Sequence, residues 1–119
     1  MSTDSTPVFQ QLAERITDGI VAGTYPEGSA VPSLNELAVF YRMNQITASK
    51  GINLLVEQEL LTKKRGVGMF VTAGAQERLR ERRRSQLRER YVVPLLREAQ
   101  LLGLTSEEIQ QLVSEEIHV

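Results

Sequence analysis

Apolar residues recur at three- and four-residue steps in several stretches of the chain, the spacing that gives an α-helix one buried face. The first stretch carries Phe9, Leu12, Ile16 and Ile20 and ends at Gly23, a residue type suited to closing a helix. The pattern predicts helices at about residues 7–22, 34–41, 45–58, 76–102 and 106–117.

Capping signals support these helices, because Ser, Thr and Asn side chains can bond the free amides of a first turn. Two of the signals have the spacing of a capping box, in which a glutamate three residues on completes the exchange. The expected caps are Thr6, with Pro7 at the first helical position, Ser33 with Glu36, Asn44, and Thr105 with Glu108.

Two short segments, at residues 61–65 and 69–72, are predicted as strands of a hairpin, with Gly66 in the flexible basic tip that joins them. A further short strand is expected near Ala30 and Val31. The order helix, strand, helix, tight turn, helix and hairpin is the layout of a winged helix-turn-helix.

The remaining third of the chain is predicted to form a helical tail. Pro94 lies inside the long helical pattern and should kink or interrupt it. The fold class is therefore mainly α with a small β-hairpin: a winged helix-turn-helix at residues 1–74 and a two-helix C-terminal dimerisation tail at 75–119.

The tail carries more apolar surface than one helical hairpin can hide, and symmetric pairing is the commonest way to bury such a surface. We therefore expect a homodimer. The residues expected at the dimer interface are Leu79, Leu87, Tyr91, Leu95, Leu102, Ile109, Leu112, Val113 and Ile117.

The net charge of −1 argues against a protein that coats nucleic acid by bulk attraction, so any such binding must rest on local patches. The charge is unevenly spread. Residues 77–90 hold seven arginines against three glutamates, whereas residues 91–119 hold one arginine against five glutamates. Within this segment, Arg82 to Arg84 are interpreted as a solvated or ion-paired helix face rather than a second DNA contact.

Several function classes are disfavoured by composition. The chain has no cysteine, and its single histidine is His118, so a thiolate or histidine metal site and histidine-based catalysis are not expected. We expect no cofactor, no metal and no enzymatic activity. The N-terminus does not resemble a secretory signal and no apolar run is long enough for a bilayer, so we expect a cytoplasmic protein without a membrane partner.

The helix at 45–58 presents a polar face that a core does not need, and the major groove of B-DNA admits one helix whose N-terminal side chains reach the bases. A glutamine at its start could bond an adenine edge, and an isoleucine could touch a thymine methyl. With the basic hairpin, the expected DNA-binding residues are Ser33, Asn35, Asn44, Gln45, Ile46, Thr47, Ser49, Lys50, Lys63, Lys64, Arg65 and Gly66.

Spaced motifs resemble the GntR family of transcriptional regulators over the whole helix and hairpin region, from Thr6 to Val71. They include Pro32-Ser33-Leu34-Asn35-Glu36-Leu37-Ala38, Glu59-Leu60-Leu61 and Arg65-Gly66-Val67-Gly68-Met69-Phe70-Val71. The tail, through Pro94-Leu95-Leu96 and Leu102-Gly103, is similar to the YtrA subfamily, in which a short helical module pairs two copies. Asn35, Gln45 and Ser49 depart from the residues common in the family, which leaves the operator preference open.

The resemblance implies a sequence-specific repressor that binds a two-fold symmetric double-stranded DNA operator as a homodimer. A small-molecule effector of unknown identity would bind between subunits or beside the junction of tail and winged helix, because 45 residues after Gly74 are too few to enclose a ligand. The alternative is a winged-helix protein-interaction module with weakened or lost DNA binding.

Overall fold

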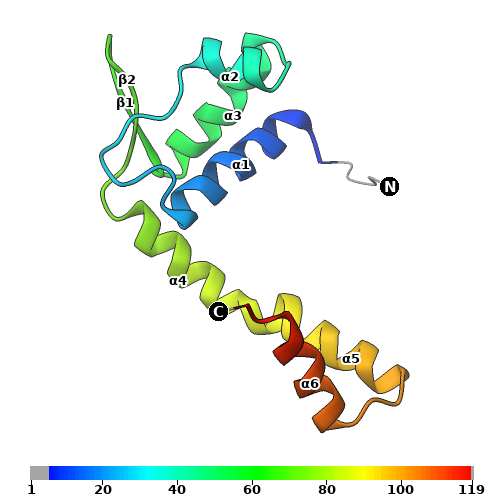
Figure 1. Ribbon diagram of the computed structural model, residues 1–119. Coiled ribbons are helices and arrows are strands. Elements are labelled where there is room, and N and C mark those ends of the chain that lie inside the picture. Colours follow the sequence, from blue (N-terminus) through cyan, green and yellow to red (C-terminus); the bar gives the residue numbers. More distant parts are fainter. Residues whose placement is uncertain (1–5, 119) are drawn as a thin grey trace. The chain divides into compact units, whose positions relative to one another are not determined.

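The computed structural model describes residues 6–118, which form six α-helices, one π-helical turn and one two-stranded hairpin (Figure 1). The predicted winged helix-turn-helix, mainly helical with a small hairpin, is confirmed. The elements are α1 (Val8–Ala22), α2 (Leu34–Phe40), α3 (Gln45–Glu57), β1 (Leu61–Lys64), β2 (Gly68–Val71), α4 (Ala75–Leu87), η1 (Arg88–Val92), α5 (Val93–Leu101) and α6 (Ser106–Glu116).

The chain divides into two compact units, with the division between Arg80 and Glu81. The sequence placed this boundary at residue 74, but the first turns of α4 belong to the core of the first unit. Ala75 is 0% exposed and Leu79 is 4% exposed, both packed in that core. Leu79, expected at the dimer interface, is therefore packed in the core of the first unit in the single chain.

The core of the first unit forms where α1 packs against α3, two helices that lie side by side in Figure 1. Leu12 and Ile16 of α1 and Ile52 and Leu55 of α3 are almost completely buried. Gly51 permits this approach: a Cβ atom there would lie 2.7 Å from the backbone oxygen of Phe9. The two helices can be this close only because α3 has no side chain at that point.

A second glycine makes room for an aromatic ring on the other side of α1. A Cβ atom at Gly19 would lie 2.5 Å from the ring of Tyr25, which covers the helix at this point. Partial burial raises the pKa of Tyr25, and the neighbouring Tyr41 adds to the rise. Tyr25 thus ties the loop after α1 to the core.

Most of the predicted helix caps are present in the structure. Ser33 and Glu36 form the expected capping box, Asn44 accepts a bond from the Thr47 amide, and Thr105 with Glu108 repeats the capping box at α6. The prediction for α1 was wrong by one residue. Pro7 occupies the N-cap, where its ψ of 148° keeps it outside the helix, so Thr6 is not the cap.

The hairpin pairs β1 with β2 in antiparallel register, with Leu61 opposite Val71 and Lys64 opposite Gly68. The strand predicted near Ala30 is reduced to a single bridge from Ala30 to Phe70. Gly66 lies in the turn with a φ of +75°, a conformation that favours glycine. The bridge holds the loop between α1 and α2 against the hairpin.

In the second unit the long predicted helix is interrupted just before Pro94, as expected. The interruption is the π-helical turn η1, after which Pro94 stands in the first turn of α5, where no amide hydrogen is needed. Gly103, with a φ of +73°, precedes the connection to α6. The described residues contain no helix with the length and apolar character that crossing a bilayer requires.

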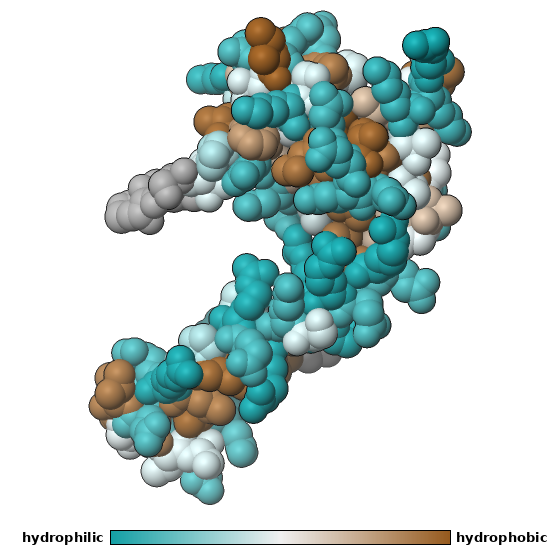
Figure 2. Space-filling model, turned by 180° about the vertical axis from the view of Figure 1, so that it is seen from behind, coloured by the Kyte–Doolittle hydropathy of each residue, from teal (hydrophilic) through white to brown (hydrophobic). Residues whose placement is uncertain are grey.

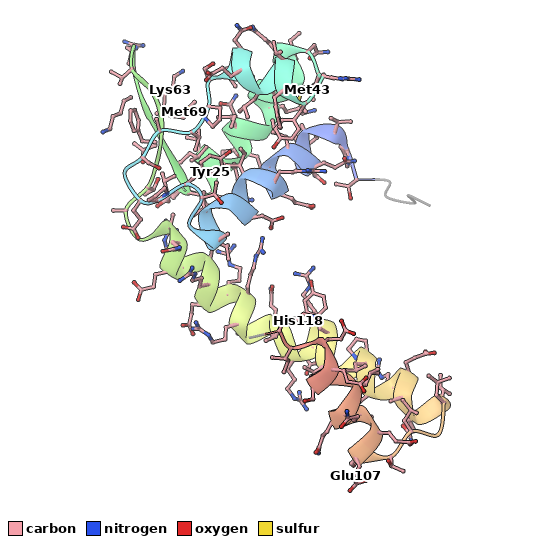
Figure 3. The ribbon with its side chains drawn as sticks, in the orientation of Figure 1. Tyr25, Met43, Lys63, Met69, Glu107 and His118 are labelled. Atoms are coloured by element: carbon pink, nitrogen blue, oxygen red, sulfur yellow. The ribbon has the colours of Figure 1, made fainter. Side chains whose placement is uncertain are left out.

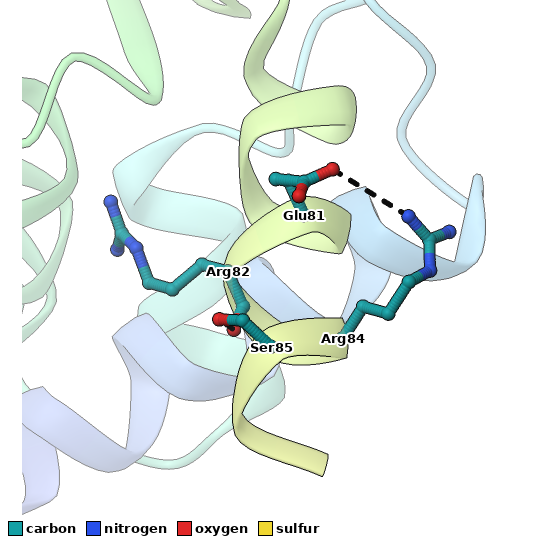
Figure 4. A network of polar contacts seen from close by, with 4 residues as sticks. All are labelled: Glu81, Arg82, Arg84 and Ser85. Carbon is teal, nitrogen blue, oxygen red and sulfur yellow. Dashed lines mark hydrogen bonds and ion pairs between the residues drawn. The ribbon is translucent and has the colours of Figure 1, made fainter. Parts of the chain in front are cut away.

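Most arginine side chains of α4 are exposed, and two of them, Arg78 and Arg80, donate to the backbone oxygens of Glu59 and Val21 at 2.7 and 3.0 Å. Arg84 pairs with Glu81, with 3.7 Å between Nη1 and Oε1, and the pair is marked in Figure 4. The Ser85 hydroxyl donates to the backbone oxygen of Arg82 at 2.8 Å. Both members of the ion pair are largely exposed, so the pair contributes little to stability.

The α1–α3 contact predicts that Gly51→Ala destabilises the protein. Alanine favours a helix by up to about 1 kcal/mol over glycine. The added Cβ meets a backbone oxygen that cannot rotate away, and overpacking costs about 1–3 kcal/mol. We expect a net loss of about 1–2 kcal/mol in the free energy of unfolding, measured by urea denaturation. Glu57→Ala, at an exposed position of the same helix, should leave it nearly unchanged, and a stabilised G51A protein would contradict the packing argument.

Candidate nucleic-acid interface

Most of the predicted DNA-binding residues line two adjoining hollows around the N-terminal half of α3. The first, of about 500 Å³, lies between α2, α3 and the hairpin. The second, of about 640 Å³, lies along the outer face of α3. The predicted residues that line them are Ser33, Asn35, Gln45, Ile46, Ser49, Lys50, Lys63, Lys64 and Gly66.

Three predicted residues lie outside these linings. Asn44 has a structural role, because its side chain caps α3 by accepting a bond from the Thr47 amide at 2.7 Å. Thr47 is half-buried in the first turn of α3, and Arg65 lies exposed in the hairpin turn. These three positions flank the hollows.

The structure adds lining residues that the sequence-based set omitted, among them Asn53 and Met69. Asn53 lies one helical turn after Ser49, and its amide nitrogen is 3.4 Å from the Ser49 hydroxyl. That four-residue spacing was the signal that could have identified it. Met69 belongs to β2, and Figure 3 labels it together with Lys63 of the paired strand.

A hydrogen bond between side chains joins α2 to α3 at the centre of this surface. The amide nitrogen Nε2 of Gln45 donates to Oδ1 of Asn35 at 2.8 Å. Both residues are exposed and both line the hollow beside the hairpin. The first turn of α3 is thus tied to the first turn of α2.

Two lysines of this surface stand over aromatic rings. Lys50 Nζ lies 4.6 Å from the centre of the Phe9 ring, and Lys64 Nζ lies 4.4 Å from the centre of the Phe70 ring. The face of an aromatic ring attracts a cation and limits its motion while leaving its N–H groups available. The rings therefore hold both charges on the same side as the polar face of α3.

The charge of the hollow beside the hairpin has one sign. Lys63 and Lys64 line it, and no acidic side chain does so among the described residues. Ile46, next to Gln45, is 81% exposed although it is apolar. No group of three or more metal-binding side chains comes together in residues 6–118. A basic hollow beside an exposed helix end suits a nucleic acid, because the lysines can bind its phosphates and the helix can contact the edges of its bases.

The family model for bacterial regulatory proteins of the gntR family matches residues 9–71, the span from α1 to the end of β2. The chain belongs to the GntR family. The resemblance inferred from the motifs is thereby confirmed. The chain spans between 26% and 34% of the length of the longer curated relatives that it matches.

Similarity to another family member continues through the tail. The HTH-type transcriptional repressor YtrA of Bacillus subtilis (strain 168) is 25% identical over 111 residues, which cover 93% of this chain and 85% of YtrA. A GntR family transcriptional regulator from Listeria monocytogenes has a similar solved structure, with a TM-score of 0.76 and 30% identity, covering 98% of this chain and 100% of that one.

The first unit is also similar to a domain solved on DNA. The DNA-binding domain of AraR in complex with operator ORX1 has a TM-score of 0.57 and 32% identity, covering 60% of this chain and 87% of that one.

Proposed function

We propose that the protein is a sequence-specific DNA-binding transcriptional repressor, which binds a two-fold symmetric operator as a homodimer. The observation that carries the proposal is the exposed N-terminal half of α3, set beside a hollow lined by Lys63 and Lys64 and by no acidic side chain of the described residues. The YtrA repressor and the operator-bound AraR domain, both similar to this chain, support it.

The proposed contacts follow from the geometry of B-DNA, whose major groove is about 12 Å wide and admits a single helix. Gln45 at the start of α3 reads a base edge, and the exposed Ile46 contacts a thymine methyl. Ser49 and Lys50 bond phosphates along the same face. The lysines and Arg65 of the hairpin follow the backbone next to the groove, where Gly66 lets the main chain approach closely.

The proposed dimer forms through the tail. In the single chain none of the eleven residues of α6 is fully buried, and apolar side chains show on the tail in Figure 2. Ile109 is half-buried. Exposed apolar surface of this extent marks an interface. The predicted interface residues that are exposed in one chain are Leu87, Tyr91, Leu95, Leu102, Leu112, Val113 and Ile117.

A second candidate function, a protein-interaction module, is favoured by a different surface. Val39 and Phe40 of α2 are both more than 70% exposed and line a largely apolar hollow of about 620 Å³.

Titration of the protein against duplex DNA from the promoter of its own gene separates the two functions. Micromolar or tighter binding that weakens with salt supports the repressor, and no binding at low salt supports the module. The small-molecule effector stays a prediction from the sequence.

The first prediction from this proposal separates phosphate contacts from base contacts. Arg65→Ala should weaken binding to all duplexes and lower the slope of log affinity against log salt by about one. Gln45→Ala should instead cost about 1–3 kcal/mol only on preferred sequences. Both are measured by fluorescence anisotropy on promoter and random duplexes. Equal effects of the two variants on both duplexes would show that Gln45 does not read bases.

The second prediction concerns the tail. The double variant Tyr91→Glu with Leu102→Glu places charges on two exposed apolar positions and should yield a folded monomer in sedimentation experiments. Its affinity for a two-site operator should fall by about 10²- to 10⁴-fold, because the second site is no longer bound intramolecularly. Gln100→Glu, an exposed polar position of α5, is the matched control and should remain dimeric. A double variant that still dimerises would contradict pairing through the tail.

A further inference from the structure

The hydrogen bond between Asn35 and Gln45 decides which groups Gln45 can offer to DNA. A primary amide has two N–H donors and one carbonyl acceptor. Gln45 uses one N–H on Asn35 Oδ1, at 2.8 Å. The groups left to it are one N–H donor and the Oε1 acceptor.

This remaining pattern matches one purine and opposes the other. Adenine presents N7 as an acceptor and its N6 amino group as a donor, so a glutamine with one N–H and one oxygen satisfies both. Guanine presents two acceptors, N7 and O6, and the glutamine oxygen would face one of them without a hydrogen between. Reversing both amides would leave Gln45 with two free N–H groups, the pattern that suits guanine. The observed orientation therefore selects adenine.

Both partners of this bond stand on backbone that is fixed locally. Asn35 lies in the first turn of α2, where Ser33 and Glu36 close a capping box with bonds of 2.8 and 3.1 Å. Gln45 is the first residue of α3, directly after the cap at Asn44. The flexible side chain of Gln45 is thus held between two fixed points before DNA arrives, which lowers the entropy lost on binding.

We propose that Asn35 is a positioning residue that orients the Gln45 amide to read adenine, so that α2 sets base specificity through α3. The inference rests on the proposed function, because it assumes that α3 enters the major groove. Asn35 itself needs no contact with a base. Its Oδ1 atom acts only on the orientation and mobility of Gln45.

Asn35→Ala and Asn35→Asp distinguish this role from a general contribution to the fold or to affinity. Alanine removes the acceptor and frees the Gln45 amide to turn, so the preference for adenine over guanine should fall by about 3- to 10-fold. Aspartate can only accept, so it should keep the adenine preference. Its added negative charge lies in the lining of the basic hollow and should nevertheless weaken binding to every duplex, because it repels phosphates.

The experiment uses the full-length protein and a library of randomised duplexes, from which bound sequences are selected and counted. Gln45→Ala identifies the position that Gln45 reads, as the one whose base preference disappears. Adenine and guanine are then compared at that position for wild type, N35A, N35D and the control Glu57→Ala, with circular dichroism to check the fold. The expected order of adenine preference is wild type equal to N35D and to the control, with N35A lower.

Three results would overturn the inference, and they differ from one another. Equal adenine preference in wild type and N35A would show that Asn35 does not position Gln45. Equal loss in N35A and N35D would show that Asn35 acts without accepting this bond. A wild-type preference for guanine at the position would show that the amide pair has the reversed orientation. Selection of no duplex at all by the wild type would instead overturn the proposed function, and this inference with it.

Discussion

The close approach of α1 and α3 at Gly51 is the constraint on which the candidate DNA-binding surface depends. The backbone oxygen of Phe9 occupies the space that any Cβ at Gly51 would need. The contact fixes α3 from the side opposite to its polar face, and Ala48 and Ile52 complete the seal, each at most 1% exposed. One consequence reaches the surface directly: Lys50, the residue before Gly51, lies over the ring of the same Phe9. Core packing thereby places a charge on the candidate interface.

The buried polar groups of this structure have hydrogen-bond partners, whereas several large apolar side chains are not buried. No buried side-chain nitrogen or oxygen of the described residues lacks a hydrogen-bond partner. Apolar side chains, by contrast, remain in solvent at several places, among them Ile46 on α3, Val39 and Phe40 on α2, and the surface of the tail around Tyr91 and Leu102. Leaving large apolar groups exposed forgoes about 1.5–3 kcal/mol of burial for each. In the proposed function a thymine methyl covers Ile46 and a second tail covers the surface around Tyr91 and Leu102.

Local signals in the sequence were sufficient for most of the fold. Helix periodicity, the caps at Ser33, Asn44 and Thr105, and the turn at Gly66 each depend on residues within one or two turns, and the structure has them all. The errors arose where contacts between residues distant in the sequence determine the position of a side chain. Leu79 continues the tail's periodic pattern, yet it packs into the core of the first unit. The bond from Gln45 to Asn35 spans ten residues and two helices, so spacing alone could not predict it. The individual roles of the candidate site residues stay predictions.

A net charge of −1 is compatible with DNA binding, because the electrostatic attraction of a phosphate depends mainly on the charges within a few ångströms of it. Screening at physiological salt limits the effective range to about 8 Å, so glutamates elsewhere in the chain do not cancel Lys63 and Lys64 in their hollow. With few cations at the candidate interface, bulk attraction is weak, and the proposed reading of bases therefore assigns more of the selectivity to neutral groups such as the amides of Asn35 and Gln45. Neutral amides discriminate between bases only when their donors and acceptors are held in a fixed orientation. In this proposal the few cations provide little selectivity between bases. The capped helices and the hydrogen bond between Asn35 and Gln45 provide more of it, because they hold the amides in a fixed orientation.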